Sequence, residues 1–261
     1  MPFNIGGYLY NSNESFYSKD YRNITTKGLI LQLDSSVVES WPQAGSTWYD
    51  ISGNGNDFTM QGNITWDSKW GFSNFTGNST GSGNKFYRSG FLRNVKTSQG
   101  GNGYTVMVFA QSSGGSGSWR KLIGNSDGDN YIDLYQSSGS PYGWHQDGSG
   151  ETLYVNTSGV TQDLFAMPMN GYNAYIATNT NSGTLTNPSA DLTIGNEPNN
   201  GNGVNLYPWV GYIGVVLIYN RVLSTVEMTQ NYNALKDRYT GYFNCGYGCS
   251  SYNYNPGCTA C

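Results

Sequence analysis

The sequence predicts an all-β protein, a two-sheet antiparallel sandwich with one short helix near the C-terminus. Short apolar runs recur about every ten residues and are separated by turns rich in Gly, Asn, Ser and Thr, a rhythm typical of a sandwich. Aromatic residues make up 15% of the 261-residue chain, and 36 positions are glycine. A sustained helical period occurs only over residues 224–239. Together these observations favour many short strands joined by polar turns.

Composition argues against two classes of partner. Charged residues make up only 11% of the chain and the net charge is −4, so there is no basic surface for phosphate contacts, and we expect no nucleic-acid partner. Apolar runs stay well below the roughly 18 residues of a membrane span, so we expect no membrane insertion. The N-terminal residues show neither a basic region nor an apolar run, and we expect no secretory signal in them.

The expected strands follow from apolar or aromatic runs bounded by turn residues. The clearest early strands are Gly28–Asp34 and Tyr104–Gln111. Within the segment Trp41–Asp57, the SGNGN core at residues 52–56 is expected to form a turn, because Asn-Gly tolerates a positive φ at little cost. The remaining candidates are Phe58–Gln61, Ile64–Trp66, Phe72–Phe75, one strand within 76–102, Lys121–Gly124, Tyr131–Tyr135, Tyr142–His145, Thr152–Val155, Leu164–Met167, Tyr172–Thr178 and Leu192–Gly195.

The most apolar stretch of the chain lies near its C-terminal end. Every residue of Tyr212–Tyr219 except Gly214 is apolar or aromatic. A half-exposed strand would alternate polar and apolar residues, so this run predicts a strand that is buried on both faces.

A helix is predicted directly after that strand. Ser224 and Glu227 have the spacing of a capping box, in which each side chain pairs with a free backbone N–H group of the first turn. An apolar face recurs at helical spacing and consists of Met228, Tyr232, Leu235 and Tyr239.

Three segments follow from these patterns. Residues 1–26 show no periodicity and are expected to form an extended arm, and residues 27–239 form the sandwich. Residues 240–261 are a Cys- and Tyr-rich tail that holds all four cysteines and is too short to build a core of its own.

Three motifs resemble concanavalin-A-like, laminin-G-like jelly-roll domains of the type found in tailed phages and large DNA viruses. They are an opening strand that ends in Asp34, the turn Trp48–Asn56, and the run Tyr219–Ser224 before a short helix. The resemblance covers residues 27–238 and leaves out the tail. It implies a jelly roll in which strands 28–34 and 212–219 are neighbours. We expect the helix to cap an open end of the sandwich or to shield a sheet edge.

The resemblance implies a non-enzymatic structural or adhesive virion component, such as a capsid-associated, fibre or tail protein. Its N-terminal arm and Cys tail would contact other virion or self subunits, and its location would be the virus particle. The alternative is a lectin module that recognises host cell-surface glycans, with or without Ca²⁺. Glycosidase activity is not expected, because no glutamate pairs with a second acid at i+2 or i+4 on a strand.

Glycan contacts are predicted at aromatic residues beside Gly/Ser-rich turns. Trp119 and Trp144 have such flanks, and Tyr142 lies two residues before Trp144. Aromatic rings with a polar end suit surfaces that are partly wet, whereas most of the other tryptophans are expected in the core.

Two segments carry candidate metal ligands, although the sequence demands no cofactor. Asp127, Asp129 and Asn130 are oxygen ligands on one loop and would suit Ca²⁺, while an Asp-Gly turn explains the same residues without a metal. The tail cysteines have a spacing that fits either two disulfides or a Zn²⁺ site. They are Cys245, Cys249, Cys258 and Cys261.

Overall fold

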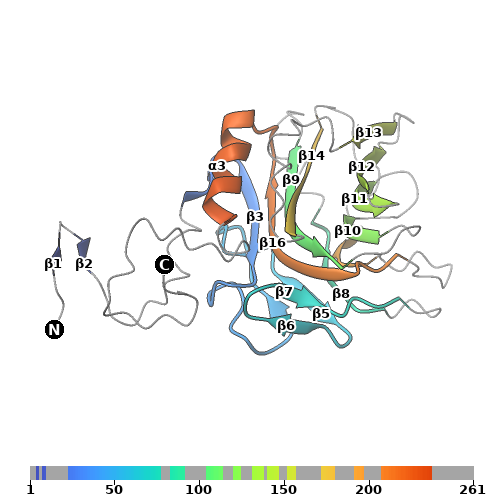
Figure 1. Ribbon diagram of the computed structural model, residues 1–261, viewed down its shortest axis with the longest axis horizontal. Coiled ribbons are helices and arrows are strands. Elements are labelled where there is room, and N and C mark those ends of the chain that lie inside the picture. Colours follow the sequence, from blue (N-terminus) through green and yellow to red (C-terminus); the bar gives the residue numbers. More distant parts are fainter. Residues whose placement is uncertain are drawn as a thin grey trace, which may run out of the picture.

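The computed structural model describes residues 4–5, 8–9, 23–77, 83–91, 104–113, 120–124, 131–137, 140–146, 152–156, 172–179, 191–196 and 207–236. Between residues 131 and 179 it describes backbone pairing together with the buried side chains of Leu134 and Ile176. Two antiparallel sheets and a helix lie in three layers (Figure 1). The predicted sandwich with one C-terminal helix is therefore confirmed for the described part of the chain.

One layer is an eight-stranded sheet. Its strands are β4 (Thr47–Trp48), β5 (Phe58–Gln61), β8 (Lys85–Ser89), β10 (Arg120–Gly124), β11 (Tyr131–Ser137), β12 (Ser140–Gln146), β13 (Thr152–Asn156) and β15 (Asp191–Ile194). They lie in the order β13-β12-β11-β10-β15-β8-β5-β4, and every neighbouring pair is antiparallel.

The second sheet has six strands. They are β3 (Leu29–Asp34), β6 (Thr65–Asp67), β7 (Gly71–Ser73), β9 (Tyr104–Ser112), β14 (Tyr172–Asn179) and β16 (Gly211–Tyr219). The order is β14-β9-β16-β7-β6. Strand β3 also pairs with β16, along residues 215–219, whereas β7 pairs with β16 at Ile213. In the N-terminal region, β1 (Asn4–Ile5) and β2 (Tyr8–Leu9) pair with each other to form a separate two-stranded sheet.

Most strand predictions are confirmed, with ends that differ by one or two residues. A strand that was not predicted is β4. Its two residues pair with Phe58 and Thr59 of β5, the next strand in the chain, and two residues are too few to show a periodic pattern. The predicted strand Leu164–Met167 lies outside the described residues.

The apolar run at the C-terminal end forms β16, which is central in its sheet as predicted. It pairs with β9 on one side and with β3 on the other, where Val216 faces Leu33. Its side chains alternate between two cores. Ile213, Val216 and Ile218 enter the core between the sheets, while Val215, Leu217 and Tyr219 enter the core beneath the helix. Both faces of β16 are therefore buried.

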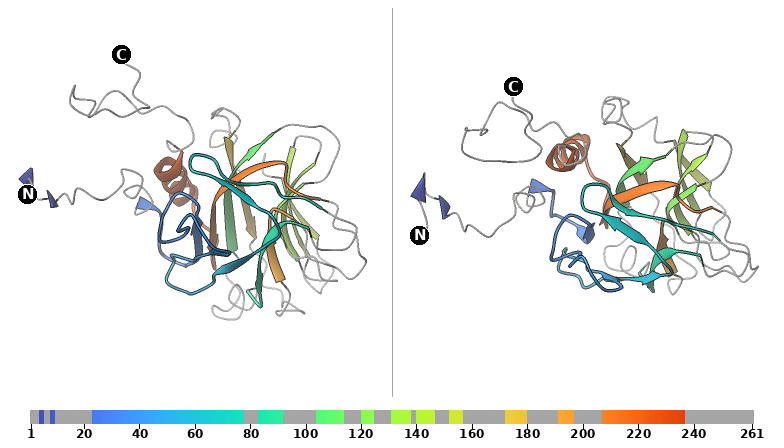
Figure 2. Two further views of the ribbon diagram at one scale, coloured as in Figure 1. Left: turned by 90° about the horizontal axis from the view of Figure 1, so that it is seen from below. Right: turned by 60° about the horizontal axis from the view of Figure 1, so that its bottom comes forward.

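The helix α3 (Thr225–Leu235) corrects one expectation. It covers the outer face of the six-stranded sheet, away from the eight-stranded sheet, and does not cap an open end or a sheet edge (Figures 1 and 2). Met228, Tyr232 and Leu235 pack there with Met107 and Phe109 of β9. Without the helix, this apolar face would be exposed to water. No helix in the described segments is long and apolar enough to cross a membrane.

The edge of β3 is covered by the turn that follows β4. The Asp50 carboxylate accepts a hydrogen bond from the Gln32 backbone N–H at 2.9 Å, and the Ile51 N–H donates to the Gln32 carbonyl at 2.9 Å. The Asn56 side chain donates to the Ile30 carbonyl at 2.8 Å. The turn thereby occupies backbone groups with which another chain could pair, and it protects this edge of the sheet.

Candidate functional site

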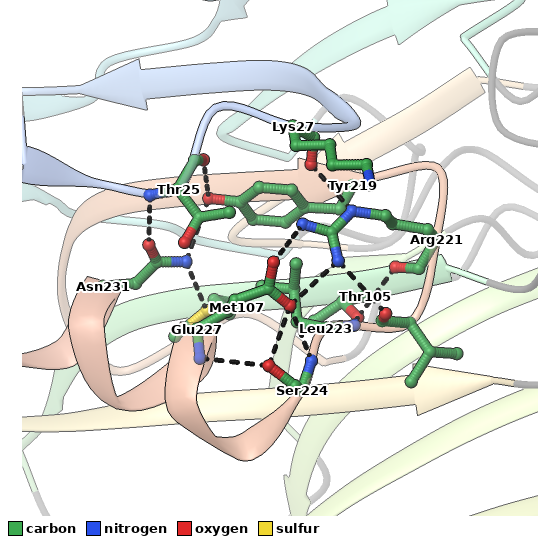
Figure 3. A network of polar contacts seen from close by, with 11 residues as sticks. Thr25, Lys27, Thr105, Met107, Tyr219, Arg221, Leu223, Ser224, Glu227 and Asn231 are labelled. Atoms are coloured by element: carbon green, nitrogen blue, oxygen red, sulfur yellow. Dashed lines mark hydrogen bonds and ion pairs between the residues drawn. The ribbon is translucent and has the colours of Figure 1, made fainter.

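A polar network joins helix α3 to the sheet and to the segment before β3 (Figure 3). The Tyr219 hydroxyl donates to the Thr25 carbonyl at 2.9 Å and accepts a hydrogen bond from the Asn231 amide at 2.9 Å. The Thr25 N–H in turn donates to Asn231 at 2.7 Å. Burial raises the pKa of Tyr219 well above its usual range, so the hydroxyl keeps the proton that it donates.

The start of the helix is fixed by a second set of contacts. The Arg221 guanidinium forms a two-pronged ion pair with Glu227, with N–O distances of 2.6 and 2.9 Å. Glu227 also accepts a hydrogen bond from the Ser224 N–H, and Ser224 Oγ accepts one from the Glu227 N–H, which confirms the predicted capping box. These side chains satisfy one another or the backbone, so the network is structural.

Glu227 makes the stability of the helix junction dependent on pH. The Arg221 hydrogen bonds lower the pKa of Glu227 to about 2. Because this pKa lies below that of an unfolded glutamate, roughly 4.3, the stabilisation is complete above pH ~5 and is lost as the pH falls from there towards 2. Glu227→Gln is expected to cost about 1 kcal/mol at pH 7 in urea unfolding, and this difference should shrink at pH 3.

The control for this experiment is Glu39→Gln, which removes the same charge from an exposed residue. Its effect should stay within about 0.5 kcal/mol at pH 7. A Glu227→Gln effect that does not change between pH 7 and pH 3 would contradict the assigned role of the carboxylate.

Two of the predicted glycan residues lie on a described strand. Tyr142 and Trp144 belong to β12, in the part of the eight-stranded sheet that β10 to β13 form (Figure 1). The other predicted ligands lie outside the described residues; they are Trp119, Asp127, Asp129, Asn130, Cys245, Cys249, Cys258 and Cys261. Within the described segments, no group of three or more His, Cys, Asp or Glu residues could hold a metal ion.

The strand register places further aromatic residues beside these two. Tyr142 is opposite Tyr135 of β11, and Trp144 is opposite Tyr154 of β13. Leu134, next to Tyr135, is fully buried in the core between the sheets. Successive residues of a strand alternate between the two faces of a sheet, so the aromatic positions lie on the face opposite to the core.

Two polar positions complete this face. Asp133 is opposite Trp144, and Asn156 is opposite Tyr142. We call the set the β11–β13 outer face; its positions are Asp133, Tyr135, Tyr142, Trp144, Tyr154 and Asn156. Directly opposite residues in a sheet are close enough to act on one ligand. Aromatic rings beside a carboxylate and an amide offer stacking surfaces and hydrogen bonds together.

Sequence reasoning missed four of these six positions. A signal for some of them was present, because Tyr131, Asp133 and Tyr135 alternate with Ile132 and Leu134. That alternation marks a strand with one apolar and one aromatic-polar face. The cross-strand partners Tyr154 and Asn156, in contrast, follow only from the register of the sheet.

Comparisons with known proteins place this chain by fold. No family model matches the sequence, and no curated protein matches it. Among solved structures, the receptor-binding domain of a botulinum neurotoxin C/D mosaic serotype is similar, with a TM-score of 0.52 and 14% identity over 81% of this chain.

Two further solved structures come from the same group. One concerns botulinum neurotoxin type C, whose cell entry depends on interaction with two ganglioside molecules. Its TM-score is 0.54, and its identity is 13% over 79% of this chain. The other is the binding domain of botulinum neurotoxin DC in complex with SialylT, with a TM-score of 0.52 and 14% identity over 80% of this chain. This chain spans about half of each structure, at 51–52% of its length. At such identities the likeness shows the fold, a β-sandwich, and the laminin-G-like and viral type stays a prediction.

Proposed function

We propose that this protein is a carbohydrate-binding module and that it recognises glycans on the β11–β13 outer face. The observation that carries the proposal is the register of β11, β12 and β13, which gathers four aromatic positions and two polar ones on the face opposite to the core. A sugar ring has apolar C–H faces and a rim of hydroxyl groups. Aromatic rings suit its faces, and carboxylate or amide groups suit its rim.

The structural comparisons support this proposal over a purely structural role. One of the similar solved structures is a receptor-binding domain, one is a binding domain in complex with SialylT, and one concerns a neurotoxin whose cell entry depends on gangliosides. Because this chain matches only about half of each, those ligands support a class of function and assign no residue.

We also propose that the module binds its ligand without catalysis. Glu227 is engaged by Arg221 and by the helix cap, so it is not free to act as an acid or base. His145, the only histidine of the chain, pairs in register with Leu153 of β13 and is not one of the positions of the β11–β13 outer face. Neither residue stands on the proposed glycan face.

A glycan array with and without a chelator tests the proposal. We expect the full chain to bind a restricted set of glycans above background. Glycan binding that persists in EDTA would assign recognition to the protein surface alone. Glycan binding that is lost in EDTA would support the Ca²⁺ loop predicted at Asp127, Asp129 and Asn130. An array on which no glycan is bound at high protein concentration, in either buffer, would overturn the proposed function.

A structural or adhesive role in a virion is the second candidate. It draws on the resemblance to viral jelly-roll domains and on the N-terminal strands, because β1 and β2 pair only with each other among the described strands. Under this proposal, the N-terminal arm and the Cys tail contact neighbouring subunits in the particle. Mass spectrometry of purified particles should then detect the protein. Its absence from particles, together with a monomeric state in solution, would exclude this role, whereas a virion protein could still bind glycans.

A further inference from the structure

A small pocket opens in the six-stranded sheet, at residues that the β11–β13 outer face does not include. Its volume is about 290 Å³. The lining residues come from β7 and the segment after it, from the residue after β9, and from the start of β16 and the two residues before it: Ser73, Asn74, Phe75, Ser113, Trp209, Val210, Gly211 and Tyr212. Phe75 and Trp209 are buried, whereas Asn74, Ser113 and Val210 are exposed. The pocket therefore has an aromatic base and an accessible rim.

Backbone and indole contacts hold one wall of the pocket. The Trp209 N–H donates to the Gly195 carbonyl at 2.8 Å, and its indole Nε1–H donates to the Gln111 carbonyl at 3.2 Å. The Ser113 N–H donates to the Val210 carbonyl at 2.9 Å. The first bond ties Trp209 to the residue after β15, and the other two join the end of β9 to the segment before β16, so this wall is formed before any ligand arrives.

Glycine allows the strands to approach closely at the same place. Gly211 has a φ of 140°, and a Cβ atom there would collide with the Gln111 carbonyl oxygen. A side chain at this position would push the segment before β16 away from β9. The pocket shape therefore depends on a residue without a side chain.

The rim is polar on the opposite side. Asn74 adopts a left-handed backbone conformation with a φ of 65°, and its side-chain amide donates to the Asn63 carbonyl at 2.6 Å. Ser73 shares a hydrogen bond of 2.9 Å with Thr65 of β6. These contacts hold one amide and one hydroxyl group at the pocket.

The chemistry of the lining selects a class of ligand. None of the eight lining residues is Asp, Glu, Lys, Arg or His, so an anionic or cationic ligand would find no opposite charge there. Hydroxyl, amide and aromatic groups instead match a neutral ring with several hydroxyl groups. Ligand pockets usually measure roughly 300–1,000 Å³, and the volume near the lower limit suits one ring.

We infer that this pocket binds one neutral monosaccharide unit, a hexose or N-acetylhexosamine, as a second subsite of the module. The inference rests on the proposed glycan-binding function but uses none of the residues that carry it. It selects against sialic acid as the occupant, because none of the lining residues is a cation that could pair with the carboxylate of that sugar.

The test uses a chemical-shift titration of the ¹⁵N-labelled full chain. Methyl glycosides of glucose, galactose, N-acetylglucosamine and N-acetylgalactosamine, and free N-acetylneuraminic acid, are added in turn. We expect at least one neutral sugar to shift the Trp209 indole signal and the Ser113 amide signal in a saturable way, and we expect no such shift with N-acetylneuraminic acid.

Two tryptophan variants locate the site. Val210→Trp places a large ring at the rim of the pocket, where Val210 is 43% exposed. It should weaken binding of the neutral sugar at least tenfold. Val226→Trp places the same ring on α3, where Val226 is 77% exposed, and it should bind as the wild type does. The double variant Ser73→Ala/Ser113→Ala removes two hydroxyl groups without adding bulk and should weaken binding at least threefold.

The outcomes separate this inference from the proposed function. Glycan binding on the array without any saturable shift at Trp209 or Ser113 would overturn the inference that the pocket binds a sugar, and it would leave the proposed function intact. Unchanged affinity in the folded Val210→Trp variant, or in the serine double variant should the first not fold, would also overturn it. Saturable binding of N-acetylneuraminic acid in the pocket would contradict the assigned ligand class. Failure of both the array and the titration would overturn both proposals.

Discussion

Replacing Asp50 with alanine is expected to lower the free energy of unfolding by about 3 kcal/mol, because one carboxylate holds the turn that covers the edge of β3. Its Oδ1 atom accepts hydrogen bonds from the Gln32 and Ser52 backbone N–H groups, both at 2.9 Å. Its Oδ2 atom accepts from the Ser52 hydroxyl at 2.9 Å and from the Asn56 N–H at 3.0 Å. Gln32 and Asn56 are buried, so their donors would lose a partner that water replaces poorly.

The matched control is Asp67→Ala, which removes a carboxylate from another turn. The Asp67 side chain accepts from the Lys69 and Trp70 backbone N–H groups, both at 2.8 Å, but it does not join the turn to a neighbouring strand. We expect a loss of about 1 kcal/mol for this change in urea unfolding. If Asp50→Ala cost no more than Asp67→Ala, the turn would not stabilise the sheet in the way described here.

Trp48→Ala is expected to cost about 4 kcal/mol, because it empties the centre of the core between the sheets. Trp48 is fully buried, and its ring packs against Phe72 at a centroid distance of 4.6 Å and against Phe86 at 5.1 Å. Thermal or urea unfolding would measure the loss. Trp48→Phe should cost no more than about 1.5 kcal/mol, because the Trp48 indole N–H has no hydrogen-bond partner in the described part of the chain.

Trp209→Phe provides the comparison for the indole group. Trp209 is buried to nearly the same degree, with 1% of its surface exposed, but its indole N–H donates to the Gln111 carbonyl. We therefore expect Trp209→Phe to be more destabilising than Trp48→Phe by about 1 kcal/mol. Equal losses for the two Trp→Phe changes would contradict the assigned hydrogen bonding.

Local patterns were sufficient for much of the scaffold. The capping box of Ser224 and Glu227 and the burial predicted for Tyr212–Tyr219 depend on residues close in sequence. The capping box is confirmed, and the burial is confirmed from Ile213 to Tyr219. The predicted position of α3 was wrong, because the actual position depends on which face of a distant strand carries Met107 and Phe109. Strand β4 was missed for a different reason, since two residues are too few to leave a periodic signal.

The motifs of the viral-type resemblance are scaffold residues in this structure. Asp50 holds a turn against β3, and Arg221 binds the glutamate of a helix cap. Such residues predict the fold but do not identify the ligand. Tyr142 and Trp144 were selected from their Gly- and Ser-rich flanks, whereas Tyr135 and Tyr154 became visible only when the strand register brought them alongside.

The most direct test of the central claim is the affinity of the best array glycan for the wild type and for the double variant Tyr142→Ala/Trp144→Ala. Each aromatic contact contributes about 1 kcal/mol, so we expect at least ~tenfold weaker binding in calorimetry, while the urea midpoint stays close to that of the wild type. Unchanged affinity in the folded double variant would contradict the claim that the β11–β13 outer face binds glycans.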